Sequence, residues 1–73
     1  MAHADMVEVE GKVLEPRANG FFLVRIEQGA EVLAHLGGKL RQNYIRVITG
    51  DRVTLELSPY DLTRGRIIFR HRS

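Results

Sequence analysis

Apolar and polar residues alternate along most of this chain, a pattern typical of half-buried β-strands. The valines of residues 7–13 share one face, whereas Glu8, Glu10 and Lys12 share the other. Gly11 falls on the apolar face, where a strand often bends or admits a close neighbour. The same period predicts further strands over residues 21–27, 31–36, 52–57 and 64–70. In the last of these, Ile67 and Phe69 are expected to face one side and the arginines the other.

Short turn sequences separate these strands. Residues 16–20 end in Asn-Gly, a strong hairpin dipeptide, and residues 28–29, 49–51 and 58–61 also have turn chemistry. Parallel pairing needs a crossover of about a dozen residues, so most neighbouring strands must be antiparallel. The predicted fold is therefore all-β: a five-stranded antiparallel Greek-key barrel of the OB-fold type, with an SH3-like barrel as its nearest competitor.

Residues 39–44 depart from the alternation. Leu40 and Tyr44 are four positions apart and would share one face of a helix. Helices below about 12 residues are marginal alone, so we expect one or two helical turns packed on the barrel between the third and fourth strands. In this interpretation Leu40 and Tyr44 anchor the segment to the core, and Lys39, Arg41 and Arg46 point outward.

The charge is unevenly distributed. Residues 1–34 hold three basic and six acidic side chains, whereas residues 35–73 hold eight basic and three acidic ones. Nine of the 11 basic residues are arginines, whose planar guanidinium suits bidentate contact with phosphate. The second half of the chain therefore favours an anionic partner, either nucleic acid or a membrane surface, over a solvated basic surface with no partner.

Two segments could contact RNA. Arginines 64, 66, 70 and 72 would project from one face of the last strand along about 26 Å, unless glutamates on neighbouring strands pair with them. Residues 37–46 combine cations, amides and a tyrosine that could also stack on an unpaired base. The candidate RNA-binding residues are Lys39, Arg41, Tyr44, Arg46, Arg64, Arg66, Arg70 and His35.

Other functions find little support. The chain has no cysteine, its three histidines lie far apart, and no apolar run reaches the roughly 20 residues that cross a bilayer. The first five residues do not resemble a signal peptide. His35, Ser58 and Asp61 could be imagined as a catalytic triad, but nothing in the sequence orients them. We expect one domain over residues 1–73, with no catalytic residue, metal or cofactor.

Three stretches of the chain resemble bacterial translation initiation factor one. They are residues 38–46, with the sequence GKLRQNYIR, residues 49–53, with TGDRV, and residues 58–67, with SPYDLTRGRI. The similarity extends over nearly the whole chain. Some positions differ from the family pattern: His3 stands where lysine is usual near the start, Gly37 replaces a serine, and Leu40 replaces a methionine. The substitution at position 40 nearly conserves volume.

The resemblance implies an OB-fold protein that binds the small ribosomal subunit at the aminoacyl-tRNA site, through ribosomal RNA and neighbouring ribosomal proteins. It implies that residues 38–46 insert against the decoding helix, and that the protein assists the GTPase initiation factor and the anti-association factor in selecting initiator tRNA. A cytoplasmic monomer without a cofactor, contacting no membrane, is expected. The alternatives are a single-strand RNA chaperone of cold-shock type, a protein-interaction barrel and, more distantly, an esterase or nuclease.

Overall fold

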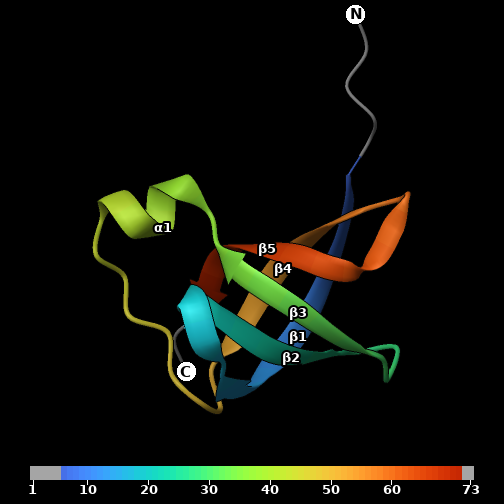
Figure 1. The fold of residues 1–73 in the computed structure, drawn as a ribbon, viewed down its shortest axis with the longest axis horizontal. Helices are drawn as coiled ribbons and strands as arrows, with labels where there is room; N and C mark the ends of the chain where they lie inside the picture. The colour runs from blue at the N-terminus through green and yellow to red at the C-terminus, as the bar shows by residue number, and fades with distance from the viewer. Residues whose placement is uncertain (1–5, 72–73) are drawn as a thin grey trace, which may run out of the picture.

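The alternating segments form the five strands of a closed barrel, with one short helix outside it (Figure 1). The structure is a computed structural model that describes residues 6–71. Its elements are β1 (Val7–Pro16), the 3₁₀ turn η1 (Ala18–Gly20), β2 (Phe21–Ile26), β3 (Glu31–Leu36), α1 (Gly38–Gln42), β4 (Arg52–Ser58) and β5 (Asp61–His71). The predicted all-β barrel with a helical segment between the third and fourth strands is confirmed.

The strands follow one another around the barrel in the order β1-β2-β3-β5-β4. Four of the five neighbouring pairs are antiparallel, and β3 pairs with β5 in parallel. The parallel pair departs from the expected antiparallel arrangement. It is possible because α1, a long loop and β4 separate β3 from β5 along the chain, which gives a sufficient crossover.

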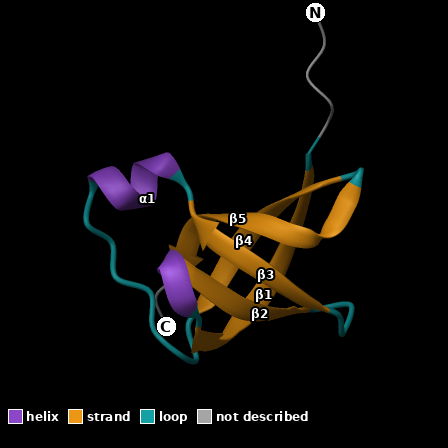
Figure 2. Cartoon of the chain, in the orientation of Figure 1, coloured by secondary structure: helices purple, strands orange, loops and turns teal. Residues whose placement is uncertain are grey.

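The core consists of the inward side chains of all five strands, together with two residues that follow β3. Val13, Val24, Val32, Leu55 and Ile67 are almost completely buried. Leu40 of α1 and Val47 of the following loop join this cluster. These two side chains therefore attach the helix and the loop to the barrel. Figure 2 shows α1 and the loop that follows it beside the strands.

Two glycines allow the strands to approach closely. A Cβ at Gly11 would lie 2.7 Å from Val24 Cγ1, and a Cβ at Gly65 would lie 2.6 Å from Leu57 Cδ2. Real Cβ atoms do not come so near, so only glycine fits at these two positions without a shift of the neighbouring strand. The close neighbour expected at Gly11 is confirmed.

A β-bulge in β5 shifts its alternation near the C-terminal end. Thr54 pairs with Phe69 and Leu55 with Ile67, which leaves Ile68 as the extra residue. Ile67 is buried as predicted, but Phe69 is 53% exposed, so its predicted inward orientation is wrong. The bulge also separates Arg70 from the arginines that precede it, because Arg70 now stands opposite the buried Val53.

Candidate nucleic-acid interface

The α1 segment begins where β3 leaves the barrel. Gly37 donates its N–H to the carbonyl of Ile67 at 2.8 Å, and a Cβ at this position would lie 2.9 Å from that same oxygen. Arg41 N then donates to Gly37 O at 3.1 Å and starts the helix. A glycine at position 37 therefore allows the helix to start directly against the β5 backbone, and the buried Leu40 holds it there.

Tyr44, the second residue after α1, has a backbone conformation that is unusual for a tyrosine. Ile45 N donates to Leu40 O at 2.9 Å and Tyr44 N donates to Arg41 O at 3.2 Å, which is the Schellman pattern of a helix C-terminus. Tyr44 occupies the position where glycine is usual, with φ 55°. A bulky residue in the left-handed region costs of order 1–3 kcal/mol. Such strain points to a use for the side chain, because folding alone favours glycine here.

The ring of Tyr44 does not anchor the segment. Leu40 is buried as predicted, but Tyr44 is 92% exposed, so the interpretation of Tyr44 as a core anchor is wrong. Its left-handed backbone turns the chain away from the helical face that Leu40 occupies, and the half-buried Ile45 packs on the core instead. The structure thus presents an aromatic ring to solvent beside three cations.

Four exposed cations near α1 and on β5 have no ion-pair partner among residues 6–71. Salt bridges join other arginines to glutamates, but none involves Lys39, Arg41, Arg46 or Arg64. All four are exposed. Arg66 differs, because its Nη2 donates a hydrogen bond to Glu56 Oε1 at 2.6 Å. This is the cross-strand pairing with glutamate that the sequence offered as the alternative to RNA contact. The structure thus leaves most of the predicted cations available to an anion.

A groove of about 370 Å³ joins the helix to β5. Lys39 and Leu40 line it from α1, and Glu56, Arg66 and Ile68 line it from the sheet. Lys39 and Arg66, predicted separately from two distant segments, therefore border the same depression. Along β5, Arg64 lies two residues further from the helix, outward like Arg66, with the buried Gly65 between them.

Arg70 takes a different position from the one predicted. Its guanidinium donates a hydrogen bond to the backbone carbonyl of Arg46. Beyond the bulge it does not share the outward face of Arg64 and Arg66, so the expected single row of arginines is wrong. Arg70 instead connects the end of β5 to the loop after α1. Arg72, the other member of the expected row, and His3 lie outside the described residues.

His35 lies between an aromatic ring and a guanidinium. It is exposed on β3, opposite Phe21 of β2 and Arg66 of β5 in the strand registers. The rings of Phe21 and His35 meet edge to face, with centroids 5.9 Å apart. Phe21 was not among the predicted contacts. Its outward position in the alternation, opposite a histidine, was the available signal, but strand register is needed to see it.

The imagined triad of His35, Ser58 and Asp61 does not assemble. Asp61 accepts hydrogen bonds from the Thr63 hydroxyl at 2.5 Å and the Thr63 N–H at 3.1 Å, and these bonds lower the pKa of Asp61. Ser58 Oγ accepts the N–H of Tyr60 at 3.1 Å. Both side chains therefore stabilise the β4–β5 turn, while His35 lies on β3 against Phe21.

The described part of the chain shows neither a metal cluster nor a membrane-spanning helix. Within residues 6–71, no group of three or more histidine, cysteine, aspartate or glutamate side chains is arranged to hold a metal ion. No helix in that range is long and apolar enough to span a membrane.

Known proteins resemble this chain in sequence and in fold. The family model described as translation initiation factor 1A / IF-1 matches residues 1–73. The solution structure of translation initiation factor IF-1 from the Wolbachia endosymbiont strain TRS of Brugia malayi superposes with a TM-score of 0.77, at 40% identity, over 93% of this chain and 80% of that one. The crystal structure of YjeQ from Thermotoga maritima gives a TM-score of 0.75 at 27% identity, over 90% of this chain but 23% of that longer one.

Proposed function

Since the chain belongs to the translation initiation factor 1A / IF-1 family, we propose that it binds the small ribosomal subunit at the aminoacyl-tRNA site and occludes that site during initiation. Binding is through ribosomal RNA, with neighbouring ribosomal proteins around it. The protein works as a cytoplasmic monomer that assists the GTPase initiation factor and the anti-association factor in selecting initiator tRNA.

The observation that carries this proposal is the α1 segment. It places an almost fully exposed tyrosine among cations that have no ion-pair partner in residues 6–71, and it is attached to a closed barrel by Leu40. Arginine and lysine neutralise phosphates, and an exposed ring stacks on an unpaired base. A short, rigidly attached element of this kind suits insertion into folded RNA better than tracking of a flexible strand.

The mechanism requires occupancy and no bond making or breaking. Lys39, Arg41, Arg46 and Arg64 contact phosphates, and Tyr44 stacks on a base that leaves its helix. Arg66 and His35 extend the contact along β5 and β3. Arg70 acts on the loop itself, because its hydrogen bond to the Arg46 carbonyl holds the backbone that carries the Arg46 side chain.

Competition with tRNA tests the occlusion. Small subunits carrying messenger RNA are first saturated with the protein, and a labelled anticodon stem-loop cognate to the aminoacyl-tRNA codon is then titrated in. The apparent Kd of the stem-loop should rise in proportion to protein concentration, as expected for exclusive binding. A stem-loop for the initiator codon is the control and should bind undisturbed. Simultaneous binding of protein and aminoacyl-site stem-loop would contradict the proposal.

Tyr44 offers a sharper test of the contact itself. Replacing it by alanine should weaken binding to small subunits about fivefold or more, because one base stacked on an aromatic ring contributes about 1–3 kcal/mol. The free energy of unfolding should change by less than about 0.5 kcal/mol, since the ring is exposed. Fluorescence titration and urea unfolding measure the two effects.

The matched control for Tyr44 is Tyr60, which is 87% exposed but lies on the β4–β5 turn. Tyr60→Ala should bind small subunits like the unmodified chain, and Tyr44→Phe should retain the stacking ring and most of the affinity. Equal losses for the two alanine variants would show that Tyr44 has no special role.

A second candidate function, a single-strand RNA chaperone, rests on the edge-to-face pair of Phe21 and His35 on the outer face of β2 and β3. In an OB-fold this face can stack bases. One aromatic pair provides a small platform, and β2 carries Leu23 rather than a further aromatic residue on the same face. Phe21→Ala should therefore affect small-subunit binding less than Tyr44→Ala; the opposite order would favour the chaperone.

A further inference from the structure

A second groove lies away from α1 and has a different character. It measures about 510 Å³ and is lined by Gly11, Lys12, Leu14, Arg25, Glu27 and Arg52. These residues belong to β1, its two neighbours β2 and β4, and the start of the turn after β2. The candidate RNA-binding residues lie on α1, β3, β5 and the loop after α1, so the two sites occupy different strands of the closed barrel.

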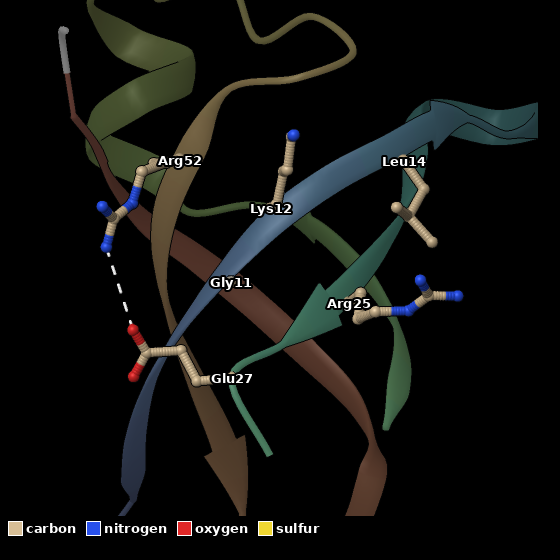
Figure 3. Close-up of a pocket in the computed structure, with 6 residues that line it drawn as sticks. All are labelled: Gly11, Lys12, Leu14, Arg25, Glu27 and Arg52. Carbon is tan, nitrogen blue, oxygen red and sulfur yellow. Dashed lines mark ion pairs between the residues drawn. The ribbon is translucent and has the colours of Figure 1, made fainter. Parts of the chain in front are cut away.

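Three like charges stand side by side across this groove. In the strand register Lys12 of β1 is directly opposite Arg25 of β2 and also directly opposite Arg52 of β4. Figure 3 shows Lys12 between the two arginines. Like charges in directly opposed positions destabilise a sheet. This row of three cations therefore lowers the stability of the folded chain, which is typical of a site that binds an anion.

Two of these three cations form ion pairs with glutamates, and the third does not. Glu31 holds Arg25 at 2.7 Å, and Glu27 approaches Arg52 at 3.8 Å, with both side chains well exposed. Lys12 has no ion pair within residues 6–71. Three cations against two carboxylates leave a local excess of a single positive charge.

The remaining walls of the groove are apolar or lack a side chain. Leu14 is the extra residue of a bulge in β1, between Val13 paired with Val24 and Glu15 paired with Leu23, and it remains partly exposed. Bulges often re-aim a side chain in this way. Gly11 lines the groove with its backbone alone, because a Cβ at this position would point toward the buried Val24.

We infer that this groove docks a segment of a partner protein that sets one carboxylate against Lys12 and an apolar side chain against Leu14. A phosphate backbone fits less well, because its successive charges would meet Glu27 and Glu31 as well as the cations. The groove lies away from the candidate RNA contacts, so a protein bound to RNA through α1 and β5 would still present it. The inference does not depend on the proposed RNA contacts.

The test uses the full ¹⁵N-labelled chain and two synthetic peptides, acetyl-GSELSSG-amide, which carries one carboxylate, and its uncharged counterpart acetyl-GSQLSSG-amide. The acidic peptide should shift the amide resonances of Gly11, Lys12, Arg25 and Glu27, and the uncharged peptide should leave them in place. Lys12→Glu should weaken the acidic peptide about fivefold or more. This variant should fold at least as stably, because it replaces the central like charge by a partner for Arg25 and Arg52.

Lys39→Glu is the matched control and should bind the acidic peptide with unchanged affinity, because Lys39 lies on α1. A single-stranded RNA oligonucleotide should leave the groove resonances in place. Peptide shifts that are absent or scattered, equal binding by Lys12→Glu, or groove shifts with RNA as large as those with peptide would each overturn the inference. None of these outcomes bears on binding to small subunits through α1.

Discussion

Replacing Arg41, Arg46 and Arg64 together by glutamine is expected to lower the affinity for small ribosomal subunits by about two orders of magnitude. The three guanidiniums are exposed and lack ion pairs within residues 6–71. Each phosphate contact contributes about 0.7–0.9 to the slope of log K against log salt, which is roughly fivefold in affinity per contact near physiological salt. Titrations at several salt concentrations should give a slope of order −3 to −5 for the unmodified chain if about five phosphates are neutralised, and a slope shallower by about two to three for the variant.

Single substitutions show whether position or total charge is responsible. Arg64→Gln removes an exposed cation of β5 that has no ion pair within residues 6–71, whereas Arg17→Gln removes one that Glu15 holds at 2.8 Å near the β1–β2 turn. Both variants lose the same formal charge. Only Arg64→Gln should lose about fivefold in affinity and reduce the salt slope by about one. A triple variant with an unchanged slope would refute the electrostatic account.

Leu55→Ala is expected to have the largest effect on stability. Leu55 is 0% exposed, and its neighbours across the strands are Val9 and Ile67. Removing a buried leucine side chain costs about 2–5 kcal/mol, because apolar contacts are lost and a cavity remains. A chain of 73 residues has a free energy of unfolding of only about 4–11 kcal/mol at typical values per residue. Urea unfolding should therefore show a much lower midpoint.

Leu62→Ala makes the same chemical change on the surface. Leu62 is 54% exposed on the β4–β5 hairpin, so its loss should alter the free energy of unfolding by less than about 0.5 kcal/mol. Equal destabilisation by the two variants would mean that the apolar cluster around Leu55 is not the core of the barrel. If the slope of the free energy of unfolding against urea concentration is the same in both variants as in the unmodified chain, the difference in stability lies in the folded state.

The strands could be predicted from the sequence because one face of each strand is buried. Val53, Leu55 and Leu57 are apolar at every second position, and this period directly records the inward face of β4. The turn at Asn19 and Gly20, which both have positive φ, could likewise be predicted, because Asn-Gly is a strong hairpin dipeptide. The anchor at Leu40 also followed from the pattern. These features depend on local propensity and burial, which a single sequence contains.

The remaining features depend on register between distant strands. The bulge at Ile68 moves Arg70 off the outer row, and nothing local distinguishes Ile68 from its neighbours. The left-handed conformation at Tyr44 is not expected of a tyrosine, and the helical spacing from Leu40 predicts a buried ring instead. The contact of Phe21 with His35, and the row Arg25–Lys12–Arg52, appear only once strands are paired.

The central claim is that the chain recognises a folded site on the small ribosomal subunit rather than RNA in general. The most direct measurement is the Kd of labelled protein for purified small subunits, compared at one physiological salt concentration with its Kd for an unstructured RNA. Tighter binding to the subunit by orders of magnitude is the predicted result. Equal affinity for the two would contradict the claim and leave only a generic basic surface.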